Sequence, residues 1–129
     1  MANLRCYDPK GAGGGVHGWY ASLPDNVQAA IDAALENIRD ESDLDGLPQL
    51  KALRGVCDGL DEITIDLDKS AKYRILCFRG PNRGDLTLLF GFKKSPRGNI
   101  DYGPHCWSAI KRKEGVIHDG RRAPPCRFP

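Results

Sequence analysis

The spacing of apolar residues changes along this chain, and that change restricts the fold more than any other feature. Between residues 25 and 40, aliphatic side chains recur at steps of three and four residues, while the residues between them are polar. Such spacing predicts an amphipathic helix of about four turns that lays one apolar stripe on a core. Ser22 and Pro24 stand where helix beginnings favour capping groups and proline. Trp19 and Tyr20, just upstream, predict a preceding turn or short helix on the same core.

From residue 60 the period becomes two, which is typical of strands. Apolar and polar residues alternate over 60–67, with Leu60 out of phase. Residues 72–79 and 85–93 predict two further strands, and turns at 68–71 and 80–84 connect the three. Consecutive strands joined by short turns favour an antiparallel meander. A short strand is expected at 4–7, and a last helix after residue 98, with Asp101 as its cap and Trp107, Ala109 and Ile110 as its anchors.

The predicted fold class is therefore α+β. An N-terminal helix or helix pair packs on a three- to four-stranded antiparallel meander, and a short C-terminal helix follows. The length of 129 residues fits one domain, which we place at residues 1–114. Residues 115–129 are rich in glycine, arginine and proline, and we expect them to form a flexible tail. The glycine-rich stretch at 11–15 lacks the lysine and hydroxyl residue of a phosphate loop, so a flexible connection is expected there.

The cysteines, the histidines and the apolar runs indicate where this chain resides. Five cysteines make an odd count with no Cys-x-x-Cys unit, so we expect buried thiols rather than a disulfide framework or a zinc ribbon. Three scattered histidines imply no metal, and no cofactor is expected. Because the chain lacks both a membrane-length apolar run and the apolar core of a secretory signal, we expect a cytoplasmic protein without membrane contact.

Charge is distributed very unevenly along the sequence. Residues 25–68 carry twelve acidic and three basic side chains, whereas residues 69–129 carry fourteen basic and four acidic ones. An asymmetry of this size predicts one acidic face and one basic face. The basic half is the part suited to meet a phosphate backbone.

Several short motifs follow one another in an order that resembles a known toxin family. They are Val16-x-x-Trp19, Leu23-Pro24, Leu50-Lys51-Ala52-Leu53-Arg54-Gly55, Leu60-x-Glu62, Tyr73-Arg74-Ile75-Leu76 and Leu88-Leu89-Phe90-Gly91-Phe92-Lys93-Lys94. Together they resemble the RelE/ParE toxin superfamily, most closely its HigB-like, phage-derived branch, over residues 16–112. The resemblance implies the toxin of a type II toxin–antitoxin system, which enters the ribosomal A site and cuts mRNA. It also implies a cognate antitoxin, of the helix-turn-helix, HigA-like kind.

The chemistry implied by this resemblance identifies candidate site residues. An RNase without a metal needs an acceptor for the ribose 2′-hydroxyl proton, cations to stabilise the crowded phosphorane, and a proton for the leaving oxygen. Arginine binds phosphate through a two-pronged fork, and a lysine among other cations can have a lowered pKa. The candidate catalytic residues are Arg74, Arg54, Lys93 and Lys94, and the candidate RNA-binding residues are Lys51, Lys72, Arg97 and Tyr102.

Other interpretations of the same residues stay open. Arg74 can pair with Glu62 across neighbouring strands as an ordinary ion pair of the sheet, and the two lysines can simply protect a strand end. The HigB-like branch usually reads Glu-Leu-Arg where this chain has Glu62-Ile63-Thr64, so a customary arginine is replaced by Thr64. A ParE-like gyrase inhibitor without nuclease chemistry and an inactive, phage-derived module that binds an antitoxin are therefore the alternative functions.

Overall fold

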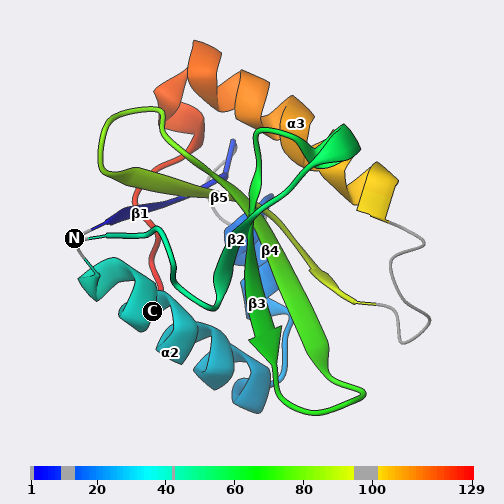
Figure 1. Cartoon of the computed structure of the whole chain (residues 1–129). Helices are drawn as coiled ribbons and strands as arrows, with labels where there is room; N and C mark the ends of the chain where they lie inside the picture. The colour runs from blue at the N-terminus through cyan, green and yellow to red at the C-terminus, as the bar shows by residue number, and fades with distance from the viewer. Residues whose placement is uncertain (1, 10–13, 42, 95–101) are drawn as a thin grey trace.

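Helices cover both faces of one central sheet (Figure 1). The computed structural model describes residues 2–9, 14–41, 43–94 and 102–129. The elements are, in chain order, β1 (Asn3–Cys6), α1 (Val16–Ala21), α2 (Asp25–Asp40), β2 (Leu50–Ala52), the short 3₁₀ helix η1 (Gly55–Cys57), β3 (Asp61–Asp66), β4 (Lys72–Arg79), β5 (Asp85–Lys93), α3 (Tyr102–His118) and a second 3₁₀ helix, η2 (Gly120–Arg122).

The sheet has five strands in the order β1-β5-β4-β3-β2. Strands β2 to β5 pair antiparallel, and β1 lies parallel to β5. The α+β class is thus confirmed, but the sheet is larger than the predicted three to four antiparallel strands, because β1 adds a fifth, parallel strand to the antiparallel strands β2 to β5. Strand β2 has only three residues, too few for an alternating pattern to reveal it. The partner of β1 lies about eighty positions away in the sequence, beyond the reach of a local pattern.

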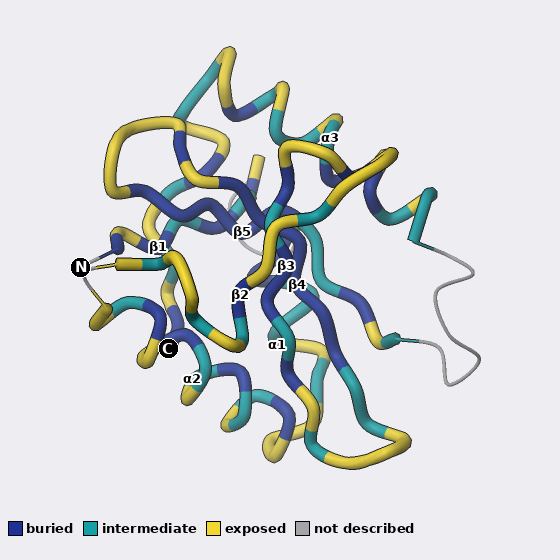
Figure 2. Tube along the Cα trace, in the orientation of Figure 1, coloured by how far each residue is buried: buried dark blue, intermediate teal, exposed yellow. Residues whose placement is uncertain are grey.

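Two hydrophobic clusters lie on opposite faces of the sheet, one under α2 and one under α3. Neighbouring residues of β4 point to different clusters, Ile75 to the first and Leu76 to the second, and both are fully buried. The stripe predicted for α2 is confirmed, because Ile31 and Leu35 are fully buried in the first cluster. In Figure 2 the strands between the two helices are mostly buried, whereas parts of both helices are exposed. Strand β4 is therefore buried on both faces rather than on one.

A glycine of the sheet makes room for an aromatic ring of α1. A Cβ atom at Gly91 would lie 2.4 Å from the Trp19 ring, so only glycine lets the indole rest on this part of β5. The contact joins two motifs that stand about seventy residues apart in the sequence. Packing therefore accounts for Trp19 in the first motif and for Gly91 in the second.

The last helix differs from its prediction in length and in one anchor. It extends to His118, so it is not short, and Ala109 is fully buried as expected. Trp107 is 69% exposed, and its prediction as an anchor is wrong. Two residues span about 200° of a helix, so Trp107 and Ala109 cannot both face the sheet. The predicted cap, Asp101, lies outside the described residues.

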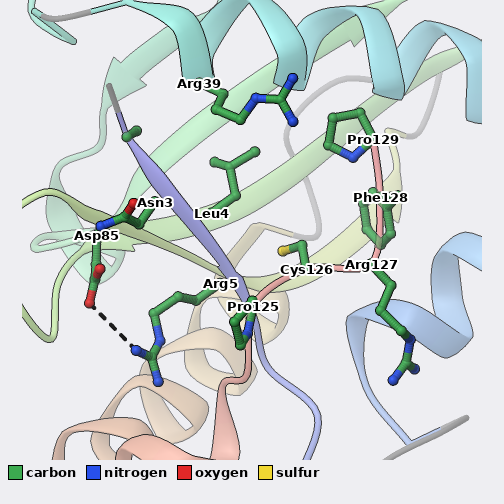
Figure 3. A pocket seen from close by; sticks show the side chains of 11 residues that line it. Asn3, Leu4, Arg5, Arg39, Asp85, Pro125, Cys126, Arg127, Phe128 and Pro129 are labelled. Atoms are coloured by element: carbon green, nitrogen blue, oxygen red, sulfur yellow. Dashed lines mark ion pairs between the residues drawn. The ribbon is translucent and has the colours of Figure 1, made fainter.

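The C-terminal segment is fastened to the domain, so the prediction of a flexible tail at 115–129 is wrong. A disulfide joins Cys126 to Cys6 of β1, and the Cys126 amide donates to the Leu4 carbonyl at 3.0 Å. Phe128 stacks on Tyr20 with ring centres 3.8 Å apart. Figure 3 shows this segment running beside β1. It covers the edge of the sheet that β1 would otherwise leave open.

The cysteines also differ from expectation. Cys6–Cys126 and Cys57–Cys106 are disulfides, with sequence separations of 120 and 49 residues, and Cys77 is a buried thiol. Burial raises the pKa of the Cys77 thiol well above its usual value. The expectation of five thiols was wrong because it rested on sequence spacing, whereas pairing depends on Cα atoms meeting in space.

No helix in the described part of the chain is both long enough and apolar enough to cross a membrane.

Replacing Ile75 by alanine tests whether the sheet is the centre of the structure. Its side chain is fully buried, so we expect a loss of about 2–5 kcal/mol in the free energy of unfolding, measured by denaturant titration. The matched control is Ile117→Ala on α3, where the side chain is 56% exposed and the loss should stay within about 0.5 kcal/mol. Equal losses in the two variants would contradict the described packing.

Candidate functional site

A cavity of about 570 Å³ opens on the α3 side of the sheet, and most of the predicted site residues meet there. Its walls come from the segment around η1, from strands β2, β3 and β4, from the end of β5 and from the start of α3. The lining residues are Pro48, Lys51, Leu53, Arg54, Val56, Cys57, Glu62, Thr64, Arg74, Lys94 and Tyr102. Five of the eight candidates predicted from the sequence are in this set, namely Arg54, Arg74, Lys94, Lys51 and Tyr102.

The strand register explains why these side chains converge. Lys51 of β2 stands opposite Glu62 of β3, and Thr64 of β3 stands opposite Arg74 of β4. Residues directly opposite each other in an antiparallel pair share one face of the sheet, as do residues two apart on one strand. All four side chains therefore point toward α3. Tyr102, the first residue of that helix, lines the cavity on the side opposite the sheet.

The remaining three candidates are not part of this cavity. Lys93 stands opposite Tyr73, whose side chain belongs to the cluster under α2, so Lys93 is on the other face of the sheet. Adjacent strand residues alternate in direction, and only Lys94 of the lysine pair lines the cavity. Lys72 shares the face of Arg74, as expected, but does not line the cavity. Arg97 lies outside the described residues.

The floor of the cavity carries two buried, paired charges, Arg74 and Glu62, while Asp66, the second partner of Arg74, has a 43% exposed side chain. Arg74 is 6% exposed; its Nη1 atom donates to Asp66 Oδ1 at 2.6 Å, and its Nε atom lies 3.6 Å from Glu62 Oε1. Burial lowers the pKa of the guanidinium, but the Asp66 hydrogen bond and the charges of Asp66 and Glu62 outweigh it and raise that pKa. The alternative of an Arg74–Glu62 ion pair is thus observed. Arg74 is held in place by two carboxylates, and its charge is largely compensated.

Tyr102 completes this network from the helix side. Its hydroxyl donates a hydrogen bond to Glu62 Oε2, and its ring meets Phe92 edge to face, with centres 5.4 Å apart. Burial raises the pKa of the phenol, and the hydrogen bond to Glu62 and the charge of that carboxylate raise it further, while Arg74 acts in the opposite direction. The pKa lies above its usual range, so the phenol keeps its proton at neutral pH.

Two cations at the cavity mouth differ from Arg74. Arg54 is exposed and Lys94 half-buried, and no ion pair of either is observed within the ranges that the structure describes. Lys51 Nζ lies 3.9 Å from Glu62 Oε1, but two thirds of its side chain is exposed, so this pairing is weak. The mouth therefore presents cations that can bind an anion, above a floor whose charges are already paired.

A disulfide holds one wall of the cavity. Cys57 of η1 lines the cavity and is bonded to Cys106, which lies one helical turn after Tyr102 on α3. The bond ties the segment that carries Arg54 to the helix that carries Tyr102. The two sides of the cavity are thus covalently connected.

Elsewhere, the acidic and basic halves of the sequence pair with each other. Arg79 of β4 donates a hydrogen bond from Nη1 to Asp45 Oδ1 at 2.8 Å, and its Nε atom lies 3.5 Å from Asp61 Oδ2 of β3. Because β3 and β4 are neighbours, several charges from the two halves neutralise each other within one sheet. The expected separation into one acidic and one basic face is wrong for this part of the molecule.

A second cavity, of about 580 Å³, lies between β1, the end of α2 and the C-terminal segment (Figure 3). Arg5 in its wall donates to the carbonyls of Ala123 and Gly120, both at 2.7 Å, and lies 3.8 Å from Asp85. None of the seven predicted site residues that the structure describes lines it. Arg5 serves to hold the C-terminal segment, so we assign the functional site to the cavity under α3.

Glu62 is the residue of the site that the sequence reasoning missed, since it was considered only as a partner of Arg74. One signal was present in the sequence. Leu60, which is out of phase with the alternating pattern, comes directly before β3. It shares its face with Glu62 and is 1% exposed. A large apolar residue on the polar face of a strand indicates that this face is covered too.

Comparison with known proteins does not identify this chain. No protein-family model matches it, and no curated protein matches it either.

Replacing Cys57 and Cys106 together by serine tests the covalent wall. The bond closes a long loop, so we expect a loss of about 2–4 kcal/mol in the free energy of unfolding, measured by denaturant titration without a reductant. Adding a reductant should lower the stability of this variant further, because Cys6–Cys126 remains. A variant as stable as the unaltered protein would contradict a structural role for this disulfide.

Proposed function

We propose that the protein is the toxin of a type II toxin–antitoxin system and cuts mRNA on the ribosome through the cavity under α3. The observation that carries this proposal is the convergence of Lys51, Arg54, Arg74, Lys94 and Tyr102 from four separate segments of the chain. The cations of the mouth, Arg54 and Lys94, fit a phosphodiester, whose charge increases as the phosphorane forms. The motif resemblance to the HigB-like branch of the RelE/ParE superfamily supports the same activity.

The proposed reaction is attack of a ribose 2′-hydroxyl on the adjacent phosphorus. It yields a 2′,3′-cyclic phosphate and a free 5′-hydroxyl. Arg54 at the mouth binds the phosphate oxygens, and Lys94 donates a proton to the leaving oxygen. Arg74 stays fixed on the floor, where Asp66 and Glu62 set its orientation. Pro48, Leu53 and Val56 supply an apolar wall against which a base can pack.

The proposed partners follow from the charges at the mouth of the cavity. A cognate, HigA-like antitoxin with an acidic segment would cover Arg54, Lys94 and Lys51 and so exclude RNA. The ribosome places the proposed site of action in the cytoplasm, where thiols are kept reduced. The chain must therefore keep its fold after reduction of both disulfides, supported by the two hydrophobic clusters, and cooperative unfolding in the presence of a reductant checks this.

One observation favours a second function, ParE-like inhibition of gyrase without nuclease chemistry. Thr64 replaces a customary arginine, and Arg74 is engaged by two carboxylates. The cations left for an anion are then those of the mouth, which also suit a binding protein. A module that only binds an antitoxin is the third possibility, and the assays below separate the three.

The double variant Arg54→Ala, Lys94→Ala tests the cationic mouth. Both side chains lie at the cavity mouth, so we expect an unchanged fold and at least a 100-fold lower rate of mRNA cleavage in a purified translation system, read by sequencing of RNA ends. The matched control is Lys69→Ala, Arg83→Ala, which removes two exposed cations outside the cavity.

Each assay outcome selects one function. Equal cleavage by the two double variants would contradict the proposed site. Loss of gyrase supercoiling without any mRNA cleavage would establish the second function. Neither effect, together with tight antitoxin binding, would leave the third.

A further inference from the structure

Glu62 is the one carboxylate in the lining of the cavity, counting the residues that the structure describes. Its side chain is 2% exposed and lies between three elements: Lys51 on β2, Arg74 on β4 and Tyr102 on α3. Buried carboxylates are uncommon unless they are paired, and this one is paired through both oxygens. Oε1 faces the two cations, whereas Oε2 accepts the hydrogen bond from Tyr102.

We propose that Glu62 is the final acceptor of the 2′-hydroxyl proton and that it acts through the hydroxyl of Tyr102. This inference rests on the proposed function, because it names the base of that reaction. In it, Tyr102 touches the substrate and Glu62 is the positioning residue behind it.

The chemistry of the lining residues leads to this assignment by elimination. Lysine and arginine are ordinarily protonated at neutral pH, so the four cations of the cavity are donors rather than bases. Cys57 is bonded in a disulfide, and on reduction it becomes a thiol, which ordinarily keeps its proton at neutral pH; Thr64 carries only a hydroxyl. Tyr102 keeps its proton, because the pKa of the phenol is raised. A carboxylate is the remaining group that can take up a proton.

Glu62 is too deeply buried to contact the substrate directly. Tyr102, which is hydrogen-bonded to Glu62, connects it to the cavity. The phenol is only partly buried at the edge of the cavity, and its oxygen retains lone pairs after it has donated its proton toward Glu62. A 2′-hydroxyl can therefore donate to the Tyr102 oxygen while Tyr102 donates to Glu62. Because the pKa of Tyr102 is raised, the phenol takes the proton of the 2′-hydroxyl as it gives its own proton to Glu62, and no phenolate accumulates.

The step balances as follows. The 2′-hydroxyl proton moves to the Tyr102 oxygen as the Tyr102 proton moves to Glu62 Oε2. The 2′-oxygen forms a bond to phosphorus, the bond from phosphorus to the 5′-oxygen breaks, and the leaving oxygen takes a proton from the Lys94 ammonium. The products are a 2′,3′-cyclic phosphate and a 5′-hydroxyl. Glu62 is then neutral and protonated and Lys94 is a neutral amine, and exchange with water restores both.

The charges around Glu62 support this role in the resting state. Arg74 Nε lies 3.6 Å and Lys51 Nζ 3.9 Å from Glu62 Oε1, so two cations face the carboxylate oxygen that Tyr102 does not contact. Asp66, on the same strand, is hydrogen-bonded to Arg74. The relay needs Glu62 as a carboxylate, because a carboxyl group that already holds a proton cannot take up another.

The variant Glu62→Gln tests the relay with little change in shape. Glutamine keeps an oxygen that accepts the Tyr102 hydrogen bond but cannot take up a proton at neutral pH. We expect at least a 100-fold lower single-turnover cleavage rate on ribosomes saturated with the protein, while ribosome binding is unchanged. We also expect the acid limb of the pH–rate profile to disappear from the residual activity. Glu36→Gln, at an exposed position of α2, is the matched control.

The variant Tyr102→Phe keeps the proposal testable even if Glu62→Gln folds poorly. It removes the relaying oxygen and leaves the buried carboxylate in place, so its loss of rate should match that of Glu62→Gln. Because the two residues act as one unit, the double variant should be no slower than either single variant.

The outcomes separate this inference from the proposed function. A folded Glu62→Gln protein that keeps the unaltered rate and acid limb overturns the relay, as do losses that add up in the double variant. Absence of cleavage by the unaltered protein, under conditions where it binds ribosomes, overturns the proposed function itself.

Discussion

The burial of both faces of the sheet is the constraint on which the rest of this structure depends. Helix α2 covers one face with a continuous apolar stripe, as an ordinary two-layer domain would require. Helix α3 covers the other face, which carries Glu62, Thr64 and Arg74. Polar groups enclosed in this way must find partners, because burial of an unpaired charge is very costly. The pairing among Glu62, Arg74, Asp66 and Tyr102 meets that demand.

Because enclosed charges need partners, the charges of the cavity are of two kinds. Those on the floor, Arg74 and Glu62, are buried and paired, and the proposed reaction uses them to orient groups and to take up a proton. Those at the mouth, Arg54 and Lys94, are available to bind an anion. A site for phosphodiester cleavage needs both kinds, since it must stabilise added negative charge and also move protons over short, fixed distances. The division is the physical reason for placing the proposed chemistry here.

Covalent bonds secure the two places where the chain would otherwise be loosely held. Cys6–Cys126 fastens the C-terminal segment along β1, and Cys57–Cys106 joins η1 to α3 beside the cavity. A domain of this size buries a limited core, so links across long loops add usefully to its stability. The second bond also links the segment of Arg54 to the helix of Tyr102, so the shape of the cavity depends on the oxidation state of Cys57 and Cys106.

The candidate cations were predicted from the motif resemblance and the chemistry that it implies. Local periodicity in the sequence was enough to predict α2 and the strands β3, β4 and β5, because each of these depends on neighbours in the chain. It did not reveal β2, the pairing of β1, the disulfides or the docked C-terminal segment, since those depend on residues that meet only after folding. The tertiary structure alone placed Lys94 inside the cavity and Lys93 outside it, and it alone gave Glu62 its hydrogen bond from Tyr102. The physical reason is that a pattern in the chain specifies which way a side chain points, whereas its chemistry depends on what another segment places against it.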